Sequence, residues 1–141
     1  SKKALVKKST ELRLTNTLFL DSVSKEEVPR YWSLLDASVV HLKKDPLFKT
    51  VIPSKIFECM GMGIPIILGV EGESARIISE NNVGLTVEPE NPEQILNALR
   101  ELRRPGVIEQ FRENGLKTAQ KYSRSALAAN MLAILQRVVK D

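Results

Sequence analysis

The residues best suited to chemistry stand in the segment VIPSKIFE, residues 51–58. Pro53 and Ser54 favour the first turn of a helix, where unpaired backbone N–H groups and the positive end of the helix dipole attract an anion. Lys55 adds a positive charge, and Glu58 follows one turn later, within reach of a neutral polyol beside a phosphate. A phosphate with an attached ribose fits this spacing. The alternative is that the turn only begins a helix, and that Lys55 and Glu58 form a surface ion pair worth under about 0.5 kcal/mol.

Short apolar strands alternate with helical patterns on both sides of this segment. The patterns predict helices at residues 2–13, from the capping box of Ser24 and Glu27 to Leu35, from Pro53 to Gly61 or Gly63, at 73–81, from Pro92 to about Arg103, from about Val107 to Tyr122, and after Ser123. The predicted strands are TNTLFLD at 15–21, ASVVHL at 37–42, PIIL at 65–68 and GLTVEP at 84–89. This alternation is typical of a parallel sheet covered by helices on both faces. We therefore predict an α/β fold with a doubly wound, Rossmann-like parallel sheet, and a single domain over residues 1–141.

The predicted topology also locates the site. In open sheets of this class, ligands bind at the carboxyl ends of the strands, beside helix N-termini. The loops after Leu20, Leu42 and Leu68 are then the candidate site. His41, at the end of the second predicted strand, is either a structural histidine or a polar contact to the ligand.

The composition excludes several other classes of protein. With 43% apolar residues, the 141-residue chain can form a core without disulfides. The single cysteine, Cys59, reads as core packing, and one cysteine with one histidine cannot complete a zinc site. The most apolar window, residues 59–70, is too short and too broken by glycine and proline to cross a bilayer. The net charge of +4 is a mild excess, and aromatic residues are only 5%. We expect a cytoplasmic protein with no metal, no transmembrane segment and no nucleic-acid partner.

Residues 34–68 resemble the donor-binding, C-terminal lobe of the family 4 (group 1) retaining glycosyltransferases of the GT-B fold. The resemblance is carried by Asp36 before a strand, the loop at 43–52, Glu58 on the next helix, and the turn Gly63-Ile64-Pro65. The PSKIFE form is similar to that of bacterial enzymes of capsule and O-antigen assembly, including those that handle amino sugars. The resemblance extends over nearly the whole chain, which by this comparison begins after the first strand and phosphate loop of the lobe.

The resemblance implies a donor site. Glu58 would bind the ribose hydroxyls, and Ser54 and Lys55, preceded by Pro53, would hold the donor diphosphate. Lys55 is also the candidate group that stabilises the leaving phosphate. Ser22 and Val23 would lie beside the nucleobase. The common pattern has a second glutamate eight positions before Glu58, in contact with the donor sugar, where this sequence has Thr50. The sugar contacts would then fall to Thr50, Val51 and Ile52.

The implied activity is transfer of a hexosyl group from a nucleotide-diphosphate sugar, such as a UDP-sugar, with retention of configuration and without a metal or other cofactor. The pathway would be bacterial surface polysaccharide or lipopolysaccharide biosynthesis, in the cytoplasm or peripherally at the inner membrane surface. An acceptor glycan or lipid-linked sugar would bind to an N-terminal lobe outside this sequence, so we expect the isolated chain to be inactive. Residues 123–139 resemble the family's terminal helix, whose apolar face would allow self-association.

Two other classes of protein remain as alternatives. A non-catalytic nucleotide-binding or receiver-like regulatory module would need an acidic cluster at the strand ends. Asp21 and Asp36 are available, but no acidic pair follows the first predicted strand. A structural interaction domain would be favoured if the protein bound no nucleotide. Doubly wound folds serve many functions, so the fold alone does not separate these classes.

Overall fold

The computed structural model describes residues 1–138 of the chain. It contains two compact units, with the boundary between Arg30 and Tyr31. The description below treats each unit by itself. The expectation of a single domain over residues 1–141 stays a prediction.

The first unit begins with α1 (Lys2–Glu11), close to the predicted helix at 2–13. Arg13 adopts a left-handed conformation, with φ of 53°, and the N–H of Leu14 bonds back to the Ser9 carbonyl at 3.0 Å. This left-handed residue ends the helix, because its backbone cannot continue a right-handed turn.

The predicted strand at 15–21 is wrong, since the structure has irregular backbone there. A strand is stable only when a neighbouring strand takes its backbone hydrogen bonds, and within residues 1–138 no strand pairs with this segment. The Lys2 ammonium bonds to the Leu20 carbonyl at 2.7 Å and to Asp21 at 2.5 Å. This contact lowers the pKa of Asp21.

Of the two hydrogen bonds of the predicted capping box, the structure shows the one from the Ser24 N–H to the Glu27 side chain. The Ser24 N–H donates to Glu27 Oε2 at 3.2 Å, but the α-helix that follows, α2 (Val28–Trp32), is only five residues long. The expected continuation to Leu35 is replaced by tight turns, in which Leu35 N–H bonds to the Trp32 carbonyl three residues back. Such bonds tighten the last turn of a helix and end it.

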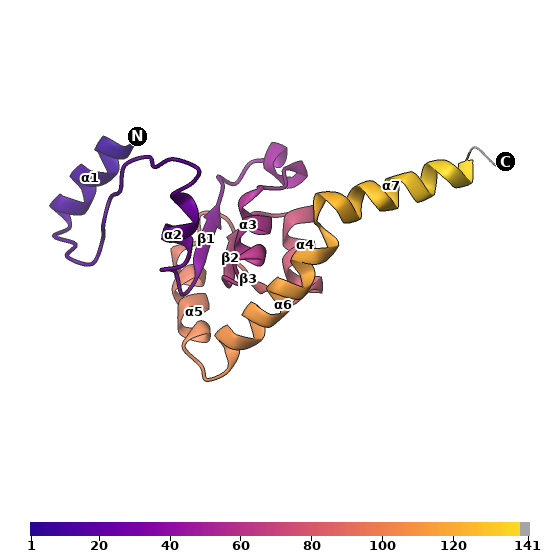
Figure 1. Ribbon diagram of the computed structural model, residues 1–141. Helices are drawn as coiled ribbons and strands as arrows, with labels where there is room; N and C mark the ends of the chain where they lie inside the picture. Colours follow the sequence, from indigo (N-terminus) through magenta and orange to yellow (C-terminus); the bar gives the residue numbers. More distant parts are fainter. Residues whose placement is uncertain (139–141) are drawn as a thin grey trace. The chain divides into compact units, whose positions relative to one another are not determined.

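The second unit is built on a parallel sheet of three strands, β1 (Ser38–His41), β2 (Ile66–Gly69) and β3 (Gly84–Thr86), in the order β1-β2-β3 (Figure 1). In the register, Ser38 lies opposite Ile66, and Ile66 lies opposite Gly84. β1 and β3 fall within their predicted segments, and β2 extends one residue beyond the strand predicted at 65–68. β2 is buried throughout, as its unbroken apolar run indicates.

Helices cover both faces of this sheet. The helical elements that follow β1 in the chain are the 3-10 turn η1 (Pro46–Thr50) and the α-helices α3 (Lys55–Gly61), α4 (Glu73–Glu80), α5 (Pro92–Leu102), α6 (Val107–Lys121) and α7 (Arg124–Val138), of which α3, α4 and α5 pack on the strands. Ile66 and Leu68 pack in one core cluster with residues of α3 and α4, whereas Ile67 packs in a second cluster with residues of α5. Figure 1 shows α5 on one side of the strands and α3 and α4 on the other. The doubly wound α/β fold is therefore confirmed.

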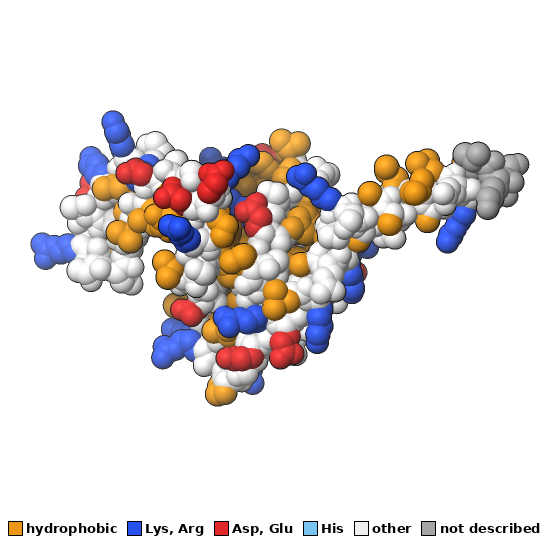
Figure 2. Space-filling model, in the orientation of Figure 1, with side chains coloured by type: hydrophobic (Ala, Val, Ile, Leu, Met, Phe, Trp, Pro, Cys, Tyr) orange, Lys and Arg blue, Asp and Glu red, His pale blue; other side chains and the backbone are white. Residues whose placement is uncertain are grey.

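The last two helices differ in how they are packed. α6 lies against α3, and a Cβ added at Gly115 would lie 3.5 Å from the Met60 Cα, an ordinary van der Waals distance. α7 has no buried residue among those described, and its exposed apolar side chains include Leu127, Met131 and Ile134 (Figure 2). Val139, the last residue of the predicted terminal segment, lies outside the described residues. None of the helices within residues 1–138 is long and apolar enough to cross a membrane.

Candidate functional site

The candidate site begins at the first turn of α3. Ser54 is the N-cap residue, with φ of −56° and ψ of −26°, and its hydroxyl makes no capping bond. The Pro53 carbonyl accepts from the Ile56 N–H at 3.1 Å, and the Ser54 carbonyl accepts from Phe57 at 3.0 Å. The N–H groups of Ser54 and Lys55 precede these bonds and have no hydrogen-bond partner within residues 1–138. These two N–H groups are the unpaired backbone donors that the start of an α-helix leaves.

Polar side chains lie beside these donors. The Ser54 hydroxyl donates to Glu58 Oε1 at 3.5 Å, a long bond between two exposed residues. Lys55 and Glu58 form no ion pair with each other, nor with any other residue of the described chain. The surface ion pair of the alternative interpretation is therefore absent from the structure. An ammonium, a hydroxyl and a carboxylate remain available on one turn.

The opposite face of α3 anchors this turn to the core. Ile56, Cys59 and Met60 are fully buried in the first core cluster. Burial raises the pKa of the Cys59 thiol, which disfavours the reactive thiolate. Cys59 is thus a packing residue, as its place in the sequence indicates.

Several polar groups of the segment that precedes α3 are bonded within the protein. Asp45 caps η1 by accepting from the Leu47 N–H at 2.8 Å. The Thr50 hydroxyl donates to the Leu47 carbonyl at 2.9 Å, and the Val51 N–H donates to the Phe48 carbonyl at 3.2 Å. Thr50, Val51 and Ile52 are all exposed. The structure brings these residues to the start of α3, since they run directly into it.

Two residues that sequence reasoning missed hold this segment in place. Ser74, fully buried in α4, donates its hydroxyl to the Val51 carbonyl at 2.6 Å. Gly72 has φ of 79°, and a Cβ added there would be 2.0 Å from the Lys49 carbonyl oxygen. Lys49 also pairs with Glu71 at 3.2 Å. The signal in the sequence was Gly72 itself, which stands between β2 and a predicted helix, where a positive φ and a close backbone approach are common.

A second polar cluster lies at the carboxyl ends of β1 and β3. His41 Nε2 accepts the Glu90 N–H at 2.7 Å, and the Lys44 N–H donates to Glu90 Oε2 at 3.1 Å. The Lys44 ammonium pairs with Glu88, which lowers the pKa of Glu88 and raises the pKa of Lys44. These contacts join the loop after β1 to the loop after β3, on either side of Gly69 at the end of β2. They support the structural interpretation of His41.

The predicted nucleobase contacts, Ser22 and Val23, belong to the first unit. Ser22 is exposed and Val23 is half-buried. Their place beside a nucleobase stays a prediction, because each unit is described by itself.

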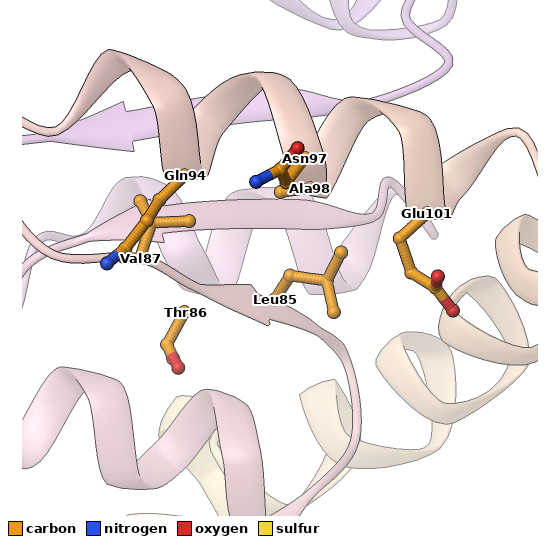
Figure 3. A pocket seen from close by; sticks show the side chains of 7 residues that line it. All are labelled: Leu85, Thr86, Val87, Gln94, Asn97, Ala98 and Glu101. Atoms are coloured by element: carbon orange, nitrogen blue, oxygen red, sulfur yellow. The ribbon is translucent and has the colours of Figure 1, made fainter.

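A hollow of about 350 Å³ lies elsewhere, between β3 and α5 (Figure 3). Its lining consists of Leu85, Thr86, Val87, Gln94, Asn97, Ala98 and Glu101. None of the predicted site residues lines it. Nor does the described part of the chain bring together three potential metal ligands of the His, Cys, Asp and Glu types.

Comparison with known proteins identifies the family. Residues 1–105 match the model described as "Glycosyl transferases group 1". Over 102 residues, 72% of this chain, the sequence is 28% identical to a putative teichuronic acid biosynthesis glycosyltransferase, TuaH, of Bacillus subtilis (strain 168), and the match covers 25% of that relative. The fold is similar to that of sucrose-phosphate synthase (tll1590) from Thermosynechococcus elongatus, with a TM-score of 0.73 at 19% identity over 98% of this chain and 34% of the other.

These matches differ in what they establish. At 19% identity, the structural likeness shows the fold alone, which is consistent with one half of a GT-B protein. The chain spans about a quarter of its curated relative and about a third of the solved structure. Because the family model covers well over half of its 141 residues, the chain belongs to the group 1 glycosyl transferases.

Proposed function

We propose that this chain is the nucleotide-diphosphate-sugar binding lobe of a retaining glycosyltransferase. The observation that carries the proposal is the first part of α3, where Ser54, Lys55 and Glu58 are exposed. Among the described residues, the N–H groups of Ser54 and Lys55 have no hydrogen-bond partner, and the Glu58 carboxylate has no ion pair. Membership of the group 1 family supports it. This set of groups suits a ligand that joins an anion to a sugar.

Each group has a distinct role in the proposed site. The Glu58 carboxylate accepts hydrogen bonds from the ribose hydroxyls, since an ionised carboxylate only accepts. The amides of Ser54 and Lys55 donate to the diphosphate, and Pro53 fixes the backbone before them. The segment Thr50-Val51-Ile52 lies beside the donor sugar.

Transfer then depends on stabilising the leaving group. Negative charge develops on the β-phosphate as its bond to the sugar breaks, and fixed N–H donors stabilise that charge without reorganisation. The Lys55 ammonium adds a positive charge at the same place. We propose that this suffices without a metal or other cofactor.

The proposed pathway is the assembly of a bacterial surface polysaccharide. The name of the B. subtilis relative refers to teichuronic acid biosynthesis, and the PSKIFE segment resembles enzymes of capsule and O-antigen assembly, some of them specific for amino sugars. The acceptor, a glycan or a lipid-linked sugar, would bind to a second lobe, and the isolated chain would be inactive. The enzyme would work in the cytoplasm or at the inner membrane surface, and the exposed apolar residues of α7 would permit self-association.

Calorimetric titration tests the proposal. UDP, GDP, ADP and UDP-N-acetylglucosamine are titrated into the protein in its full natural length, and into the variants Glu58→Ala and Glu93→Ala. Glu93 is a matched control, because it is an exposed glutamate in the first turn of another helix, α5. We expect one nucleotide to bind, with at least tenfold weaker binding in Glu58→Ala and unchanged binding in Glu93→Ala. Absence of binding by every nucleotide, or equal losses in both variants, would refute the donor site.

A further inference from the structure

We propose that residues 1–20 form a surface that binds an anionic lipid bilayer. This surface belongs to the first unit and does not involve the donor site at α3, so either proposal can fail without the other. Of the two locations proposed for the enzyme, it selects the membrane surface and identifies the residues that would touch it.

The excess positive charge of the chain is concentrated in these residues. Residues 1–20 contain five of the 21 basic residues and one of the 17 acidic residues, which gives them a net charge of +4. The other 121 residues contain sixteen of each kind and are neutral as a group. Lys3, Lys8 and Arg13 form no ion pair with any residue of the described chain. The segment therefore presents cations that anionic headgroups can neutralise.

The same residues expose apolar side chains. All five leucines of the segment are between 46% and 81% exposed: Leu5, Leu12, Leu14, Leu18 and Leu20. Figure 2 shows hydrophobic and basic side chains together over α1 and the loop that follows it, on the left of the view. Insertion into the headgroup region of a bilayer would remove these leucines from water. A nucleic-acid backbone, which has no apolar part, would leave them exposed.

A hollow in the first unit combines the two properties. Its volume is about 250 Å³, and it is lined by Leu5, Leu12, Leu14 and Phe19 together with Lys8. An acyl chain that enters such a hollow covers the apolar side chains, while the flexible stem of the lysine carries its ammonium to the lipid phosphate. An anionic lipid supplies both groups in one molecule.

The kind of basic residue also favours a lipid surface. Four of the five are lysines, all on α1: Lys2, Lys3, Lys7 and Lys8. A lysine ammonium is a compact charge on a flexible stem, and it needs no fixed geometry in its partner. Specific recognition of a carboxylate or of a nucleic-acid phosphate instead favours the planar fork of arginine. We therefore infer a bilayer of anionic phospholipid, and not an acidic protein or a nucleic acid.

Flotation with lipid vesicles tests this inference on the protein in its full natural length. The vesicles contain phosphatidylcholine alone, or phosphatidylcholine mixed with phosphatidylglycerol. We expect binding to the anionic vesicles only, strongly weakened at about 1 M salt, where the Debye length falls to about 3 Å. Equal binding to both kinds of vesicle would overturn the inference. So would equally strong binding to a DNA duplex, or displacement from the vesicles by soluble glycerol phosphate at matched ionic strength.

A charge variant connects the binding to this segment. The combined substitutions Lys3→Gln, Lys8→Gln and Arg13→Gln should weaken binding to the anionic vesicles on the order of 100-fold, because each basic residue near such a surface contributes about fivefold. Wild-type affinity in this variant would show that another part of the protein makes the contact.

A second charge variant is the matched control. The substitutions Arg103→Gln, Lys121→Gln and Arg124→Gln remove the same charge from exposed residues of the second unit that have no ion pair within the described chain. This control should keep its vesicle affinity within about threefold, since charges away from the contact are screened by salt. Equal losses in the two variants would mean that only the overall charge matters, and the inference would fail.

An apolar variant tests the insertion. Leu18 is the most exposed of the five leucines, at 81%, and Leu18→Ser should weaken vesicle binding about tenfold. The control Leu96→Ser, at a 47% exposed position on α5, should bind as the wild type does. Urea denaturation shows that each variant is folded. Unchanged binding in both Leu18→Ser and Leu5→Ser would refute the insertion, whether or not the protein binds a nucleotide through Glu58.

Discussion

Gly69 and His41 should be energetically coupled across the end of the sheet. A Cβ added at Gly69 would be 2.5 Å from His41 Cδ2, about 1 Å short of ordinary van der Waals contact. The Gly69→Ala variant must therefore displace the imidazole. Displacement by that amount stretches the 2.7 Å bond between His41 Nε2 and the Glu90 N–H beyond hydrogen-bonding distance.

The expected magnitude has two parts. Loss of the hydrogen bond lowers the free energy of unfolding by about 0.5–1.5 kcal/mol, and an off-rotamer imidazole adds about 0.5–1.5 kcal/mol. Gly69→Ala should thus destabilise the wild-type protein by about 1–3 kcal/mol. In a His41→Ala background neither loss occurs, so the same substitution should be neutral or stabilise by up to about 1 kcal/mol through the unfolded state. The coupling free energy is then about 1–4 kcal/mol.

Urea denaturation of the four proteins in this cycle measures the coupling. Trp32, the single tryptophan, packs against the first core cluster and reports unfolding by fluorescence. Because Nε2 accepts a hydrogen bond, the proton of the neutral ring should be on Nδ1, which nitrogen NMR detects. If Gly69→Ala is equally destabilising with and without His41, the imidazole is not the group that excludes a side chain, and the reasoning fails.

Three further predictions concern the core and the surface. Gly115→Ala should raise the free energy of unfolding by about 0.5–1 kcal/mol in urea denaturation, because alanine has a higher helix propensity than glycine. The new Cβ would lie 3.5 Å from Met60, an ordinary contact. A lower free energy of unfolding would show that α6 cannot accept the added methyl group. The Lys44–Glu88 pair lowers the pKa of Glu88, so its stabilising effect should be complete above pH 4.5 and disappear as the pH falls through the lower folded value. The stability difference between wild type and Lys44→Gln should therefore vanish in acid; a difference that persists there would point to another cause. Cys59, buried and with a raised pKa, should react with a thiol reagent only after unfolding, and fast reaction in native buffer would contradict its packing.

Elements defined by neighbouring residues were predicted well from the sequence. Pro53 fixes its own φ and has no N–H to lose, which suits the first turn of a helix, and α3 begins within two residues of it. The apolar run at 65–68 required burial on both faces, and β2 is fully buried. The segment at 15–21 has a similar apolar, β-branched composition but forms no strand, because a strand also depends on a partner that composition does not specify.

The long-range contacts of the candidate site were not predictable in the same way. Ser74 and Val51 are 23 residues apart, and His41 and Glu90 are 49 residues apart. Serine and histidine have many other uses, so nothing in their local sequence indicates these partners.

Local rules were thus sufficient for the parallel α/β arrangement and for the start of the helix that carries Ser54, Lys55 and Glu58. They depend on backbone geometry and on the spacing of apolar residues, both of which are properties of adjacent positions. The support of the site arises only when β1, β2 and β3 align in register and bring the loops at their ends together. That alignment is set by the packing of the whole core, which is why Ser74, Gly72 and His41 acquired their roles in the folded molecule.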